Sequence, residues 1–182
     1  MIRFNKSSAA LAAACALALG STFAITARAD EGERKLVLSF IEDGAGADAL
    51  RAGEYAKAIK QINVHVLSGD EGARSTNLCV ALIMVRQWDT ARNTCNSAVT
   101  DAQLDIPDAA FGLRSGHDAA LALAYSNRAV LNFLAGRSEA AVRDVTRARK
   151  LSPQSPFVSQ NRVVMNAPAP AVTGPAIAAI RR

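Results

Sequence analysis

The sequence predicts an all-α fold, an α-solenoid in which helix–turn–helix units stack side by side. Tyr125, Ala129 and Phe133 recur at helical spacing, and Ala141, Val145 and Ala148 do so after a short break. Gly136 lies in that break and Pro153 follows the second pattern, as expected where helices end. The same pair of patterns recurs along the chain, which indicates a repeat architecture.

Asparagines mark the phase of this repeat. Asn161 follows Asn127 by 34 residues, and Asn77 precedes Asn127 by 50, one period plus 16 inserted residues. Small residues recur at matching places in each unit: Gly46, Gly53, Ala58, Ala91, Ala98, Ala129, Gly136, Ala141 and Ala148. Together these motifs resemble the tetratricopeptide repeat (TPR), a unit of about 34 residues. The resemblance implies a right-handed α-solenoid of about three such units with a C-terminal capping helix.

The expected boundaries follow from this phase and from composition. We expect a signal peptide at 1–29, an N-terminal extension at 30–45, a TPR-like helical domain at 46–166 and a disordered Ala/Pro-rich tail at 167–182. Within the domain we expect repeats at about 46–71, 72–103 and 117–153, a capping helix at 156–166 and an inserted loop at 104–116. The residues of the extension fit either a strand-like segment or a first helical turn.

The N-terminal segment has the features of an export signal. Arg3 and Lys6 precede an apolar run, and Ala27 and Ala29 form a small-x-small cleavage site. We therefore expect a periplasmic or secreted bacterial protein with no transmembrane segment after the signal is removed. Removing Arg3, Lys6 and Arg28 lowers the formal net charge from +5 to +2, which does not indicate a nucleic-acid partner.

Two cysteines, Cys79 and Cys95, follow the signal. They lie at about equal distances from the turn between two predicted antiparallel helices, so they could face each other. An exported protein favours a disulfide between them, although a pair of reduced core cysteines remains the alternative.

Nothing in the sequence predicts an enzyme. His65 and His117 have no cysteine or carboxylate at metal-ligand spacing, and no serine lies in a nucleophile motif. We expect no catalytic residues, no metal ligands and no cofactor.

The resemblance instead implies a binding groove lined by the first helix of each repeat. The matching residues are Ala73, Thr76, Val80, Ile83, Met84, Leu123, Ser126, Val130, Phe133 and Leu134. This mostly apolar set suits a protein or peptide partner and makes an adaptor or assembly factor of the cell envelope the expected function. The alternative is that the chain fills the groove itself, with its capping helix or inserted loop.

A basic helix face supports a second hypothesis. Arg143, Arg147 and Lys150 share one side of a predicted helix and could bind an anionic envelope surface, either lipid or glycan. Cations near a helix C-terminus also stabilise the helix dipole, which would explain them without a ligand.

Overall fold

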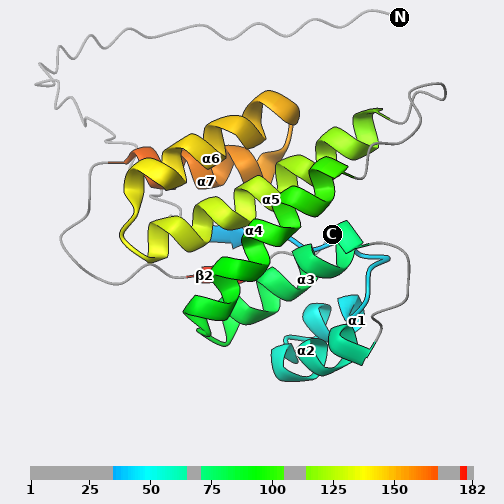
Figure 1. The fold of residues 1–182 in the computed structure, drawn as a ribbon. Coiled ribbons are helices and arrows are strands. Elements are labelled where there is room, and N and C mark those ends of the chain that lie inside the picture. The colour runs from blue at the N-terminus through cyan, green and yellow to red at the C-terminus, as the bar shows by residue number, and fades with distance from the viewer. Residues whose placement is uncertain (1–34, 65–70, 105–113, 168–176, 180–182) are drawn as a thin grey trace, which may run out of the picture. The chain divides into compact units, whose positions relative to one another are not determined.

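Helices make up most of the computed structural model, which describes residues 35–64, 71–104, 114–167 and 177–179 (Figure 1). In chain order the elements are β1 (Leu36–Leu38), α1 (Ala47–Arg51), α2 (Tyr55–Val64), α3 (Glu71–Met84), α4 (Trp88–Leu104), α5 (Arg114–Leu134), α6 (Ser138–Leu151), α7 (Pro156–Asn166) and β2 (Ile177–Ala179). The predicted all-α class is confirmed for these residues, with two short strands added. The predicted signal peptide, His65 and residues 105–113 of the inserted loop lie outside them.

The helices pair through turns of one kind. Gly53, Arg86 and Gly136 have φ angles of 76°, 61° and 73°, the left-handed conformation that ends a helix. The next residue then bonds back across the turn, as from the N–H of Arg137 to the C=O of Asn132 at 2.8 Å. Only Gly136 and Gly53 were indicated by residue type, because arginine rarely adopts a positive φ.

Small side chains allow the paired helices to approach closely. The predicted alanine positions are all 0 % exposed: Ala58, Ala91, Ala98, Ala129, Ala141 and Ala148. They belong to one core that runs through every helix from α1 to α7. Because these side chains carry a single methyl group, the apolar residues around them can interlock across α3–α4 and α5–α6.

A cysteine pair joins α3 to α4. The sulfur atoms of Cys79 and Cys95 lie 2.04 Å apart and their Cα atoms 4.9 Å apart, so the pair that the sequence singled out is at disulfide distance. Both residues are buried.

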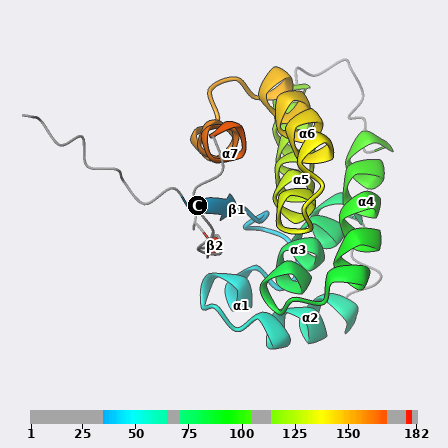
Figure 2. The same cartoon turned by 90° about the vertical axis from the view of Figure 1, so that its left-hand side faces the viewer.

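The last helix, α7, spans the residues expected for the capping helix. Pro156 is its first residue, and the hydroxyl of Ser155 accepts a hydrogen bond from the N–H of Val158 at 3.5 Å. Val158 and Met165 on α7 are buried in the core. Figure 2 shows β1 lying between α7 and α5, with β2 beside β1.

The two strands form a parallel sheet from distant parts of the chain. Leu36, Val37 and Leu38 of β1 pair with Ile177, Ala178 and Ala179 of β2, respectively. Within the described part of the N-terminal extension, residues 36–38 therefore form a strand rather than a helical turn. Within the tail that the sequence assigned to 167–182, residues 177–179 form β2, because the second backbone edge of β1 gives them a partner.

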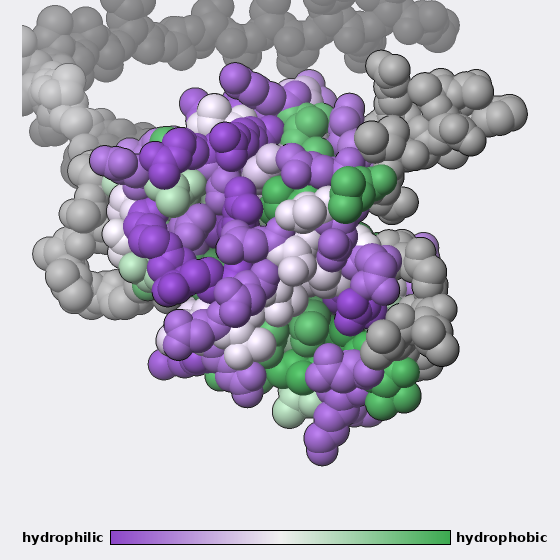
Figure 3. All heavy atoms as spheres, viewed as in Figure 1, coloured by the Kyte–Doolittle hydropathy of each residue, from purple (hydrophilic) through white to green (hydrophobic). Residues whose placement is uncertain are grey.

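Hydrophilic residues predominate on the face of α4 and α6 that Figure 3 presents. Among the described residues, no helix combines the length and the apolar character that crossing a membrane requires.

Candidate peptide-binding surface

An extended segment of the chain lies against α3, α5 and α7. We call residues 35–41 the resident segment; it contains β1 and its immediate flanks. Leu36, Val37 and Leu38 are 0 % exposed, and Ser39 and Phe40 are 8 % and 6 % exposed. Leu36, Leu38 and Phe40 belong to the same core cluster as the helices. The segment is thus part of the interior rather than a surface strand.

Asparagine side chains hold the backbone of this segment. Asn161 of α7 accepts from the N–H of Val37 at 2.7 Å and donates to its C=O at 2.8 Å. Asn127 of α5 does the same at Ser39, with distances of 3.1 Å and 2.7 Å. We call Asn77, Asn127 and Asn161 the asparagine ladder.

Asn77 of α3 completes the ladder at Ile41. Its oxygen accepts from the N–H of Ile41 at 2.7 Å, and its nitrogen donates to the C=O of Ile41 at 2.9 Å and of Ala45 at 3.2 Å. The ladder therefore satisfies both backbone groups of every second residue. A primary amide is suited to this, because it carries one acceptor and one donor group side by side.

The alternation separates the two edges of the resident segment. The backbone groups of residues 37, 39 and 41 point to the ladder. On the same edge, the C=O of Lys35 accepts from the side-chain amide of Gln160 at 2.9 Å. Along an extended chain, neighbouring residues direct their backbone groups to opposite edges. The backbone groups of Leu36 and Leu38 accordingly point to β2, which lies on the other edge.

The ladder is built into the core. Asn77, Asn127 and Asn161 are 0 %, 1 % and 0 % exposed. The amide of Asn161 also donates to the hydroxyl of Ser126 on α5 at 3.0 Å, so a neighbouring helix fixes its orientation. Buried amides that find all their partners give a strong preference for one arrangement of the bound backbone.

The groove residues inferred from the resemblance lie in the helices that hold the resident segment. Six of them are buried and four are partly exposed; the buried ones are Ala73, Thr76, Val80, Ile83, Ser126 and Val130, and the others are Met84, Leu123, Phe133 and Leu134. Among the described residues, the hydroxyl of Thr76 is buried without a hydrogen-bond partner. The sequence offered the capping helix or the inserted loop as the part of the chain that fills this groove. The segment 35–41, which bonds to α3, α5 and α7, was not among those alternatives.

The asparagine ladder was missed as a functional feature, although its signal was present. The recurrence of Asn77, Asn127 and Asn161 served only to set the repeat phase. An uncharged, buried amide at one place in each unit needs partners. That requirement could have identified these residues as hydrogen-bonding groups.

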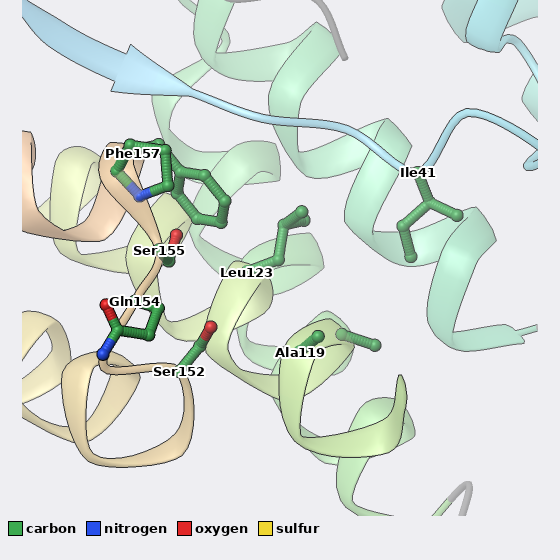
Figure 4. Close-up of a pocket in the computed structure, with 9 residues that line it drawn as sticks. Ile41, Ala119, Leu123, Ser152, Gln154, Ser155 and Phe157 are labelled. Carbon is green, nitrogen blue, oxygen red and sulfur yellow. The ribbon is translucent and has the colours of Figure 1, made fainter. Parts of the chain in front are cut away.

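A pocket of about 520 Å³ opens beside the end of the resident segment (Figure 4). Ile41, Leu123 and Phe157 extend toward it from the segment, from α5 and from the start of α7. Ser152, Gln154 and Ser155 of the α6–α7 connection form its polar side. Of the predicted groove residues, Leu123 is the one that lines it.

The predicted basic face is partly neutralised. Arg143 lies 3.6 Å from the carboxylate of Glu139, and Arg147 lies 3.8 Å from that of Asp144. Arg147 also stands 5.7 Å from the ring centre of Tyr125. Lys150 is exposed on the same helix.

Arg128 joins three helices at the edge of that face. It bonds both oxygens of Asp144 on α6, at 2.8 Å and 2.9 Å, and reaches Asn96 on α4 at 3.2 Å. The hydrogen bond to Asp144 raises the pKa of Arg128 above its ordinary value, against the opposing effect of burial. Since Asp144 is 4 % exposed, this bidentate pair is a structural link between α5 and α6.

Candidate metal ligands are not assembled in the described part of the chain. No group of three or more histidine, cysteine or acidic side chains there could hold a metal ion. His117 lies 3.6 Å from Asp118, its neighbour on α5.

Comparison of the chain with protein-family models, with curated proteins and with solved structures found no match. Membership of the TPR family therefore stays a prediction from the repeat motifs.

Proposed function

We propose that this chain is a non-catalytic TPR-type module that binds an extended segment of a partner protein through its asparagine ladder. In this proposal α1–α2, α3–α4 and α5–α6 are the repeats of a solenoid and α7 is its cap. The ladder is the observation that carries the proposal: three amides at one place in successive units hold an extended backbone.

The contacts favour recognition of a backbone rather than of particular side chains. Each ladder residue bonds the N–H and C=O that every residue except proline carries, so a peptide of a different sequence could make the same bonds. The core around Leu36, Leu38 and Phe40 adds a preference for apolar residues at alternate positions. In this interpretation the resident segment occupies the site in cis and shows how a partner would lie.

The proposed setting is the bacterial cell envelope, with the chain acting as an adaptor or assembly factor. The signal-like sequence at 1–29 and the cysteine pair at disulfide distance support export. Binding to an anionic surface through Arg143 and Arg147 is the weaker candidate, because both have carboxylate neighbours.

The test uses the full chain and a fluorescent peptide with the sequence of residues 34–43. A Val37→Pro/Ser39→Pro variant removes the two N–H groups that donate to Asn161 and Asn127. This loss should release the resident segment. We expect this variant to bind the peptide at least about tenfold more tightly than the unchanged chain, a difference of about 1.4 kcal/mol. Fluorescence anisotropy measures the affinity, and circular dichroism checks the fold.

Methylated peptides provide the matched control. A methyl group on the amide nitrogen of Ser39 removes a bond to the ladder, whereas the same group on Phe40 lies at the other edge. We expect the first peptide to lose most of its affinity and the second to retain it. A folded variant that binds neither peptide, or both equally, would overturn the proposal.

Should the prolines prevent folding, the unchanged chain can be tested with a photo-crosslinking group at position 38 of the peptide. Attachment to α5 or α7, abolished by methylation at Ser39, supports the proposal. Absence of attachment at saturating peptide contradicts it.

A further inference from the structure

The second edge of the resident segment is a further place where a strand binds. Val37 uses both of its backbone groups on Asn161, so only Leu36 and Leu38 face β2. Ala178 lies opposite Val37 in the register. Parallel pairing in this register therefore directs the N–H of Ala178 to the C=O of Leu36, and the C=O of Ala178 to the N–H of Leu38.

The strand on this edge is short and has weak strand-forming residues. β2 contains three residues, Ile177, Ala178 and Ala179, and alanine is depleted in strands. β1, in contrast, is fixed from its other edge by asparagines of α5 and α7 and by the core. A stable edge paired with a weak strand is the arrangement in which an added strand can exchange.

The surroundings specify the charge of an added strand. An added strand that pairs with β1 in the register of β2 has its first residue opposite Leu36. If that register continues, its fifth and sixth residues lie opposite Phe40 and Ile41. Glu42 and Asp43 follow directly, and both are exposed. Arg51 lies 3.8 Å from Glu42, whereas no ion-pair partner of Asp43 occurs among the described residues.

The chain's own sequence matches this specification. Ile177, Ala178 and Ala179 are followed by Ile180 and then by Arg181 and Arg182. In the chain's own sequence, an apolar run is thus followed by two basic residues.

We propose that the Leu36–Leu38 edge of β1 is a docking site for a partner's extended peptide in which a short apolar run is followed by basic residues. The peptide adds in parallel to β1 and displaces β2, which is its internal counterpart. This inference shares with the proposed function the idea of a peptide partner, but it concerns the opposite backbone edge.

The experiment uses a fluorescent peptide with the sequence of residues 174–182 and the full chain carrying Ala178→Pro. Proline cannot donate to Leu36, so the internal strand should leave the edge. We expect the variant to bind the peptide at least about fivefold more tightly than the unchanged chain. Equal binding by the two folded proteins would overturn the proposal.

Altered peptides test the two parts of the proposal. N-methylation at Ala178 should abolish binding, whereas N-methylation at Ala179, whose backbone faces away from β1, should not. Arg181→Glu and Arg182→Glu in the peptide should weaken binding at least about tenfold at low salt, and Asp43→Asn in the chain should weaken it in the same direction. Binding that ignores peptide charge would contradict the basic partner.

A second measurement avoids dependence on the proline variant. In the unchanged chain, saturating peptide that carries a photo-crosslinking group at position 180 should attach to residues 38–43. Failure to attach counts against this edge. N-methylation at Ser39 of the peptide with the sequence of residues 34–43 tests the asparagine ladder alone. The proposal for the ladder and the proposal for the Leu36–Leu38 edge can therefore be rejected separately.

Discussion

Asparagine is the residue that the ladder requires. Its amide matches the N–H and C=O of one peptide unit, whereas aspartate offers no donor and alanine offers neither group. In the ladder each asparagine is buried, so loss of the amide leaves at least two backbone groups without their partners. An unpaired buried group costs about 1–3 kcal/mol.

Asn127→Ala should therefore lower the free energy of unfolding by about 2–4 kcal/mol, because the N–H and C=O of Ser39 lose their partners. Urea denaturation followed by circular dichroism measures the change. Asn93→Ala is the matched control, since Asn93 is exposed on α4, and it should change stability by less than about 0.5 kcal/mol. Equal effects of the two substitutions would contradict a stabilising role of the ladder.

Gly44 tests the approach of the backbone to Asn77. A Cβ atom at Gly44 would lie 2.7 Å from the side-chain nitrogen of Asn77 and 3.2 Å from the Cβ of Ala73. Gly44→Ala should destabilise the chain by about 1–3 kcal/mol, because neither neighbour can move without breaking core contacts.

Gly116→Ala is its control. Gly116 is inside α5, and apart from the adjoining turn of that helix no atom of the described residues lies within 4 Å of a Cβ built there. Alanine should there be neutral or stabilise by up to about 1 kcal/mol. Thermal unfolding of both variants decides the matter, and a Gly44→Ala protein as stable as the unchanged one would contradict the close approach.

At the scale of elements, the helix pairs are held together by small residues and one cross-link. α3–α4 has the cysteine pair, whereas α5–α6 has the bidentate contact between Arg128 and Asp144. The two links act differently. A disulfide restricts the unfolded chain, whereas the ion pair depends on geometry in the folded chain.

Replacing both cysteines by alanine should lower the free energy of unfolding by about 3 kcal/mol, the loop-closure value for a separation of this size. Denaturation of the oxidised chain, with and without reductant, provides the comparison. Reductant should destabilise the unchanged chain and leave the Cys79→Ala/Cys95→Ala variant unaffected. Insensitivity of the unchanged chain would show that the thiols are reduced.

At the scale of the whole molecule, local patterns predicted the helices well. Apolar periodicity and small residues placed α3 to α7, since these features report on neighbours within one turn or one hairpin. The turn at Arg86 was not signalled by residue type. Arg86 adopts its left-handed conformation in the turn between the packed helices α3 and α4, although arginine rarely adopts a positive φ.

The candidate site was harder to predict, because it depends on distant partners. The sequence placed residues such as Val130 and Ser126 on a common surface. It did not indicate that residues 36–38 would lie against α5. The hydrogen bonds between that segment and Asn127 or Asn161 span 88 and 124 residues. No period of the sequence reports on contacts of that kind.

That same separation has a kinetic consequence. The helix pairs close over short stretches of chain and can form early, whereas the hydrogen bonds between Val37 and Asn161 require α7. Residues made among the first are thus put in place among the last. Until then, the backbone groups of Val37 lack the amide of Asn161, and that part of the site is open to any other extended chain.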